Sequence, residues 1–191
     1  MFFPRFIKNS FLILLAFLII PTVLCAAEGK HAMVVTAHPY ATETALRILK
    51  KGGNTVDAAC AAQWVLNVVE PQSSGLGGGG FFLFYEAREK RVYAFDGRET
   101  APHAAFPEMF LAPDGNPYPY YPDRVTGGLP VGVPGILRLL DHMHSRFGSK
   151  KFSFAELFDP AVDLARKGFP ISSRLAKILE EEEERLKLFS E

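Results

Sequence analysis

A run of glycines restricts the possible folds of this chain more than any other feature. Five of the six residues from 75 to 80 are glycine, and the run leads directly into Phe81 and Phe82. The almost uniformly apolar segment 56–69 precedes it. A helix that is apolar on every side is buried on most sides, and glycine permits close backbone approach. The sequence therefore predicts a buried helix that turns through the glycines into a strand.

This glycine run does not match the usual phosphate-binding loops. A P-loop needs Lys and then Ser or Thr after its last glycine, and neither follows here. A dinucleotide-binding turn has a strand before the glycines and a helix after them, whereas this pattern has the opposite order. We therefore interpret the glycines as sites of close backbone approach and positive φ angles. A second role, lining a pocket with backbone amides, stays open.

Helix signals lie on both sides of a glycine pair at residues 52–53. Residues 41–51 carry apolar side chains on one face, and the glycines are expected to end this helix. Asn54 follows in a position to cap the next helix, with Asp57 in its first turn. The sequence thus predicts two consecutive helices, the second of which is the apolar segment 56–69.

Two aromatic and β-branched runs, 81–85 and 91–95, predict a hairpin joined by the polar residues 86–90. The first strand is apolar throughout, so both of its faces are expected to be covered. An isolated hairpin is only marginally stable. We therefore expect part of a sheet, with its other strands elsewhere.

The C-terminal half alternates loop and helix signals. Residues 102–134 are rich in Pro, Gly and Tyr and predict a loop, and residues 134–147 predict a helix. Ser153 begins a capping box for a further helix, which Pro160 is expected to break or kink. A last helix from Ser173, which includes the five glutamates at residues 180–184, is expected to reach the chain end. The fold class is α+β, mostly helices plus one β-hairpin.

The N-terminus has the pattern of a secretory signal peptide. Two basic residues precede the apolar residues 11–20, and small residues lie at the cleavage position ending at Ala27. The apolar stretch is shorter than the roughly 20 residues of a membrane-spanning helix. We expect a signal peptide over 1–27 and a mature part over 28–191. The mature protein is expected in the periplasm or outside the cell, without a stable membrane anchor.

Composition excludes some classes of partner. Hydrophobic residues make up 48% of the chain and charged residues 22%, as is ordinary for a globular protein. The formal net charge of zero argues against nucleic acid as a partner. After signal cleavage Cys60 would be the single cysteine, which leaves no internal disulfide. The five histidines show no metal-ligand spacing, so neither a metal nor another cofactor is expected.

A single arginine follows the second predicted strand. Arg98 lies within the sequence Asp-Gly-Arg-Glu-Thr-Ala-Pro at residues 96–102. Its guanidinium can bind a carboxylate through two parallel hydrogen bonds, and ligand-binding residues often lie in the loops after strands. Arg98 could instead form a weak exposed ion pair with Asp96 or Glu99, which is the commoner arrangement from the residues alone. Both interpretations stay open at this point.

Several motifs, taken in order, resemble the large subunit of the gamma-glutamyltransferases, also called gamma-glutamyltranspeptidases or glutathione hydrolases. These motifs lie at residues 52–59, 75–82, 96–102, 131–135 and 159–169. The resemblance implies an N-terminal nucleophile hydrolase fold, in which two sheets pack between helical layers (αββα). This chain would hold only the first part of a large subunit, so the fold is expected to be partial.

The resemblance also implies a chemistry. The family's precursor cleaves itself, and a threonine freed at the start of the small subunit attacks the gamma-glutamyl amide of a substrate such as glutathione. The acyl group then passes to water or to an amino acid. The family's motif implies that Arg98 holds the substrate's α-carboxylate and that no catalytic residue lies in this chain. The chain alone is therefore expected to be inactive, with the rest of the large subunit and the small subunit as missing partners.

Two alternatives stay open. The incomplete sheet and the last helix without a stop signal also fit a non-enzymatic exported remnant or interaction module. A different enzyme could use Ser73 or Ser74, which lie beside the glycine run. No His or Lys close in sequence marks either serine as activated.

Overall fold

The computed structural model describes residues 28–188 of the 191-residue chain. The predicted signal peptide and its cleavage site, residues 1–27, lie outside the described residues. Residues up to Met33 form a unit separate from Val34–Glu191, and residues 28–33 contain no helix or strand. Among the described residues, no helix is long and apolar enough to cross a membrane.

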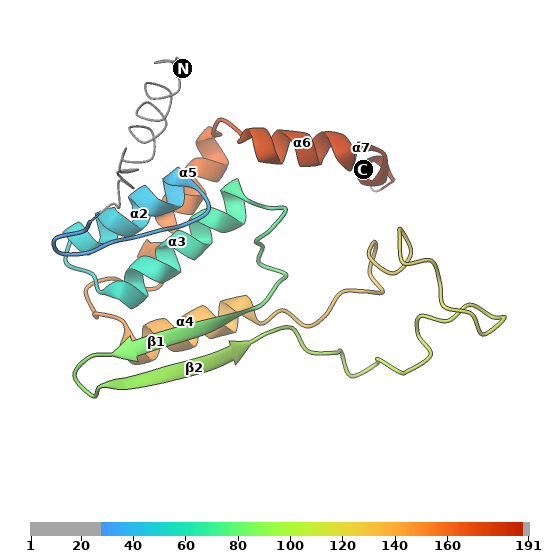
Figure 1. Cartoon of the computed structure of the whole chain (residues 1–191), viewed down its shortest axis with the longest axis horizontal. Helices are drawn as coiled ribbons and strands as arrows, with labels where there is room; N and C mark the ends of the chain where they lie inside the picture. The colour runs from blue at the N-terminus through green and yellow to red at the C-terminus, as the bar shows by residue number, and fades with distance from the viewer. Residues whose placement is uncertain (1–27, 189–191) are drawn as a thin grey trace, which may run out of the picture. The chain divides into compact units, whose positions relative to one another are not determined.

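Two consecutive helices, α2 (Pro39–Lys50) and α3 (Thr55–Val69), pack against each other (Figure 1) and confirm the first two helix predictions. The chain leaves α2 through Gly52, whose φ of +86° is a conformation that glycine adopts at little cost. Most of α3 is buried, as its apolar sequence predicts. Small alanine side chains along α3 allow the neighbouring helix to lie close to it.

The core surrounds α3, which packs against α2 and against the C-terminal part of the chain. Phe158 stacks on the buried Trp64 with ring centroids 4.1 Å apart, and Phe154 meets Trp64 edge-on at 5.7 Å. Aromatic pairs of this kind stabilise a fold beyond the area that they bury. Because Phe158 directly precedes α5 (Asp159–Lys167), this stack holds α5 against α3.

The predicted hairpin is confirmed as a two-stranded antiparallel sheet of β1 (Gly80–Glu86) and β2 (Arg91–Gly97). Helix α4 (Ile136–Phe147) covers one face of this sheet (Figure 1). The Phe147 ring lies 4.9 Å from the ring of Phe84, between centroids. The sheet therefore connects to the rest of the fold through α4.

The other face of the sheet is exposed. Phe81, Leu83 and Tyr85 on β1 are 70%, 75% and 59% exposed, and Val92 on β2 is 64% exposed. The prediction that both faces of the first strand are covered is therefore wrong for the described residues. Side chains alternate along a strand, so α4 can cover only every second one. The expectation of further strands elsewhere stays a prediction.

Two predictions for the C-terminal half need correction. Ser153 and Glu156 form the predicted capping box, in which the Ser153 N–H donates to Glu156 Oε2 at 2.7 Å. This box precedes only the short 3-10 helix η1 (Ala155–Leu157). Pro160 does not break a helix, because it lies in the first turn of α5. In the first turn the missing N–H of proline costs no intrahelical hydrogen bond.

The last predicted helix is interrupted. Helices α6 (Ser173–Glu181) and α7 (Glu183–Lys187) meet at Glu182, so the prediction of one continuous helix is wrong. Tyr121 Oη donates to Glu182 Oε2 at 2.8 Å, which joins this break to a distant part of the chain. Tyr121 belongs to residues 102–134, which contain isolated β-bridges but no helix or strand, as the loop prediction requires.

Candidate functional site

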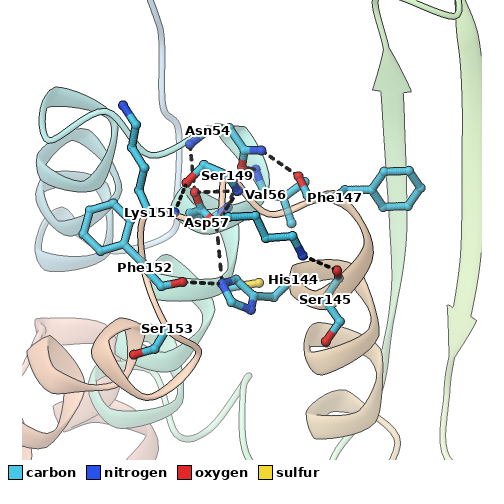
Figure 2. A network of polar contacts seen from close by, with 12 residues as sticks. Asn54, Val56, Asp57, His144, Ser145, Phe147, Ser149, Lys151, Phe152 and Ser153 are labelled. Carbon is cyan, nitrogen blue, oxygen red and sulfur yellow. Dashed lines mark hydrogen bonds and ion pairs between the residues drawn. The ribbon is translucent and has the colours of Figure 1, made fainter.

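A polar network holds the start of α3 against the end of α4 (Figure 2). The Asn54 side chain accepts hydrogen bonds from the Val56 N–H at 3.0 Å and the Asp57 N–H at 3.1 Å. Asp57 Oδ2 accepts from the Asn54 N–H at 2.9 Å, which confirms the predicted cap as a capping box. Asn54 Nδ2 also donates to Phe147 O at 2.6 Å. A local capping motif thus joins α3 to the helix that supports the sheet.

Asp57 and His144 lie at the buried centre of this network (Figure 2). Both carboxylate oxygens of Asp57 accept from the Ser149 N–H at 3.2 Å. His144 Nε2 lies 3.7 Å from Asp57 Oδ1 and 3.0 Å from Phe152 O. A buried carboxylate is stable only with such partners. We therefore assign the network a structural role, which is to fix α4 and with it the sheet.

The glycine run and Arg98 border a cavity of about 580 Å³. Helix α3 contributes Ala59 and Gln63 to its wall, and α4 contributes Ile136 and Leu139. Arg98 also borders two further cavities of about 510 and 350 Å³. Concave sites with a few convergent polar groups are where small ligands bind. Arg98 thus lies at a point that three cavities share.

Close backbone packing explains the glycine at position 79, whereas a Cβ atom on Gly78 would make only ordinary contacts, the nearest 3.4 Å from Gly75 O. A Cβ atom on Gly79 would lie 2.5 Å from Gly97 O and 2.7 Å from the Cα atom of Arg98. Gly78 O accepts two hydrogen bonds of 3.0 Å from the N-cap and first residue of α4. The predicted close backbone approach is confirmed at Gly79, and the backbone that it contacts is that of Gly97 and Arg98. The predicted positive φ angles are wrong, because no glycine in residues 75–80 has a positive φ.

Arg98 makes one of the two ion pairs considered from the sequence. Its Nε lies 3.3 Å from Glu99 Oε2, and the two side chains are 57% and 26% exposed. Asp96 accepts instead from the backbone N–H of Arg98 at 2.9 Å. The Glu99 oxygen is buried and accepts no aligned hydrogen bond from the described residues. The ion pair uses Nε, and within residues 28–188 no other hydrogen bond or ion pair occupies the two terminal nitrogens, which can bind a carboxylate.

Within residues 28–188, neither Ser73 nor Ser74 has a hydroxyl hydrogen-bonded to a base, and no metal site is assembled. Ser74 Oγ donates to Asn67 Oδ1 at 2.9 Å and accepts from Gln63 Nε2 at 2.6 Å. Amide side chains do not take up a proton at neutral pH, so they cannot activate this hydroxyl. In the same residues, no three His, Cys, Asp or Glu side chains gather as metal ligands.

The sequence does not single out Gln63, which borders the cavity, or Asn67, which bonds to Ser74 at the cavity wall. The signal that could find them is two amides four residues apart on an otherwise apolar helix, where they face the same side. Their partner Ser74 lies in a loop whose path the sequence does not reveal.

Solved structures define the class of this fold. The chain is similar to the gamma-glutamyltranspeptidase of Helicobacter pylori, with a TM-score of 0.80 and 36% identity over 86% of this chain and 46% of that one. It is also similar to the cephalosporin acylase of Bacillus halodurans, with a TM-score of 0.65 and 25% identity over 88% of this chain and 32% of that one. The fold is therefore a partial N-terminal nucleophile hydrolase fold of mostly helices with one two-stranded sheet.

Within this class, the chain belongs to the gamma-glutamyltranspeptidase family, whose model matches residues 41–191. It is 47% identical over 158 residues to the glutathione hydrolase proenzyme of Bacillus subtilis (strain 168), which covers 83% of this chain and 26% of that protein. It is 35% identical over 147 residues to the capsule biosynthesis protein CapD proenzyme of Bacillus anthracis, and the match covers 77% of this chain and 24% of that protein. The family resemblance of the ordered motifs is confirmed. The chain spans about a quarter of the length of these relatives.

Proposed function

We propose that this chain supplies the part of a gamma-glutamyltransferase or glutathione hydrolase that binds the substrate's α-carboxylate. The observation that carries the proposal is Arg98, which is exposed where three cavities meet and lies on backbone packed against Gly79. A guanidinium in this position recognises a carboxylate through two parallel charged hydrogen bonds. The similarity to glutathione hydrolase proenzymes supports glutathione or another gamma-glutamyl compound as the ligand.

In the proposed enzyme, bond cleavage depends on residues outside this chain. A hydroxyl supplied by the small subunit attacks the gamma-glutamyl carbonyl carbon, an ester forms, and the amine leaves with a proton. Water or an amino acid then takes the acyl group. Arg98 contributes by fixing the far end of the substrate relative to that carbon. We expect the chain alone not to hydrolyse glutathione, because the described residues hold no base-activated hydroxyl beside the cavity.

The role of Arg98 is tested in an enzyme assembled from this chain and the matching remainder of the Bacillus subtilis relative. Arg98→Ala removes charged hydrogen bonds that contribute about 1.5–3 kcal/mol. The KM for glutathione is therefore expected to rise about ten- to hundredfold. Arg98→Lys should give an intermediate KM, because a lysine keeps the charge without the planar fork.

Steady-state hydrolysis kinetics give the KM of each variant. Arg88→Ala is the matched control, since Arg88 lies in the exposed turn of the hairpin and does not border any of these cavities. It should leave the KM unchanged. An unchanged KM in Arg98→Ala would show that Arg98 does not hold the substrate.

Sequencing the gene beyond the codon for Glu191 tests whether the remaining parts exist. A continuing or adjacent frame that encodes a threonine-led small subunit would support the enzyme. A stop codon with no such segment nearby would favour a remnant of the family.

The exposed apolar face of the sheet favours a second candidate, a non-enzymatic interaction module or remnant. Exposed apolar patches of this kind mark interaction sites or destabilised folds. Purification of the mature chain distinguishes the two. A stable monomer that unfolds cooperatively would count against a mere remnant.

We also propose that the protein is exported, on the basis of the signal-peptide pattern in residues 1–27. Expression of the full chain in a bacterial host, followed by cell fractionation and mass spectrometry, is expected to find a product that begins at Glu28 outside the cytoplasm. An intact chain that stays in the cytoplasm would contradict export.

A further inference from the structure

Three polar side chains form a cluster where α3 meets the glycine run. Gln63 and Asn67 lie one turn apart on α3, and Gln63 Nε2 donates to Asn67 Oδ1 at 2.9 Å. Ser74 Oγ donates to the same Asn67 oxygen at 2.9 Å and accepts from Gln63 Nε2 at 2.6 Å. All three side chains are half-buried. This amide–serine cluster closes a ring of hydrogen bonds between a buried helix and a loop.

The amide–serine cluster fixes one end of the glycine run. The backbone N–H groups of Ser73 and Ser74 also donate to Glu70 O, at 3.0 and 2.9 Å, so the loop turns tightly after α3. Within the run, the Gly78 N–H donates to Gly75 O at 3.2 Å. The hydrogen bonds from α4 to Gly78 O fix the other end. The run is therefore held between α3 at Ser74 and α4 at Gly78.

The position of the glycine run determines the position of Arg98. Gly79 is packed so closely on Gly97 O and on the Cα atom of Arg98 that no side chain fits between them. Gln63, Ser74 and Arg98 border the same cavity. A displacement of the run at Ser74 would therefore move both the cavity wall and the backbone that carries the guanidinium.

We propose that Gln63, Asn67 and Ser74 are positioning residues that hold the glycine run, and through it Arg98, in the geometry that binds substrate. The inference rests on the proposed function of Arg98. None of the three residues is required to contact the substrate, since they act on Arg98 through the backbone of residues 75–79. Their loss is thus expected to weaken substrate binding more than it slows the chemical step.

The test uses the assembled enzyme with glutathione as substrate. Ser74→Ala and Gln63→Met each remove hydrogen bonds while keeping the space filled or nearly filled. Each is expected to raise the KM about two- to tenfold, the effect of one neutral hydrogen bond, and to change kcat less than about twofold. Ser74→Thr keeps the hydroxyl and should restore most of the affinity. Ser145→Ala, at an exposed position on α4, is the control and should leave both constants unchanged.

A double-variant cycle separates a positioning role from a purely structural one. If Ser74 acts through Arg98, the addition of Ser74→Ala to Arg98→Ala should raise the KM no further. Additive effects, or a lowered melting temperature with an unchanged KM in Ser74→Ala, would overturn the inference. A raised KM in Arg98→Ala with no effect of Ser74→Ala or Gln63→Met would overturn the positioning role alone. An unchanged KM in Arg98→Ala would overturn the proposed function of Arg98, and with it the proposal that the amide–serine cluster acts on substrate binding through Arg98.

Discussion

Cys60 lies on the buried side of α3, and its Sγ is 3.8 Å from Leu140 O in α4. Burial, and secondarily the negative charge of Asp57, raise the pKa of this thiol to about 12. The thiolate is the reactive form of cysteine, and at neutral pH almost none of Cys60 is ionised. Cys60 is therefore a packing residue rather than a nucleophile.

Thiol labelling of the mature chain checks this environment. With a disulfide reagent such as DTNB at pH 8, the native chain is expected to react far more slowly than the chain unfolded in guanidinium, because Cys60 is both inaccessible and protonated. Cys60→Ser gives the background signal. Equal rates in the native and unfolded states would mean that α3 is not packed against α4 as described.

Single residues differ in how far sequence alone reveals their roles. Asn54 could be identified as a cap and Arg98 as a candidate ligand-binding residue, because a cap and a strand-end arginine are local patterns. Of the two acidic neighbours, Asp96 and Glu99, that the sequence offers as ion-pair partners of Arg98, only the structure shows that Glu99 is the one used. The pairing of Asp57 with His144 and of Ser74 with the α3 amides could not be identified, because those partners meet only after the chain folds.

Helices α3 and α4 are joined at their ends through Asn54, which bonds to its own helix and to Phe147 O. Asn54→Ala removes both the cap and the link between the helices. It is expected to lower the free energy of unfolding by about 2 kcal/mol. Urea unfolding of the mature chain, followed by circular dichroism, measures the change.

Asn116→Ala provides a matched control for this prediction. Asn116 lies in an exposed turn, where its side chain bonds only to Asp114 among the described residues. Its replacement should change the free energy of unfolding by less than about 0.5 kcal/mol. If Asn54→Ala and Asn116→Ala lowered the free energy of unfolding equally, the linking role of Asn54 would be contradicted.

Element boundaries were predictable where local chemistry decides them. Glycine ends α2 as expected, because Gly52 adopts a positive φ of 86° that other residues disfavour. Gly148 ends α4 for a different reason, since its φ is −62° and a Cβ atom there would lie 2.5 Å from His144 O. The place of Pro160 in the first turn of α5 could not be predicted, since a proline either starts or breaks a helix and the local sequence does not show which. The break at Glu182 involves a hydrogen bond from Tyr121, a tertiary contact that the local sequence does not show.

At the scale of the whole molecule, the uncovered face of the sheet is an exposed apolar surface of the described residues. Phe81, Leu83, Tyr85 and Val92 present adjoining apolar side chains to solvent. We expect the isolated mature chain to bind the dye ANS and to self-associate at high concentration. Leu83→Glu should weaken both effects, as measured by dye fluorescence and sedimentation velocity.

The control for this prediction is Val162→Glu, which places the same charge at an exposed apolar position on α5, away from the sheet. It should leave dye binding and self-association unchanged. An isolated mature chain that stays monomeric and binds no dye would contradict the exposure of this face.

The space available for a side chain differs along the glycine run, so some of its positions can carry a reporter group. Gly79 is enclosed by the backbone of β2, whereas a Cβ atom on Gly75 or Gly77 would meet nothing within 4 Å. Both open positions border the same cavity as Arg98. A cysteine introduced at position 77 in a Cys60→Ser background could carry a fluorophore beside that cavity. Its emission would then report the arrival of a ligand directly, with no need for turnover.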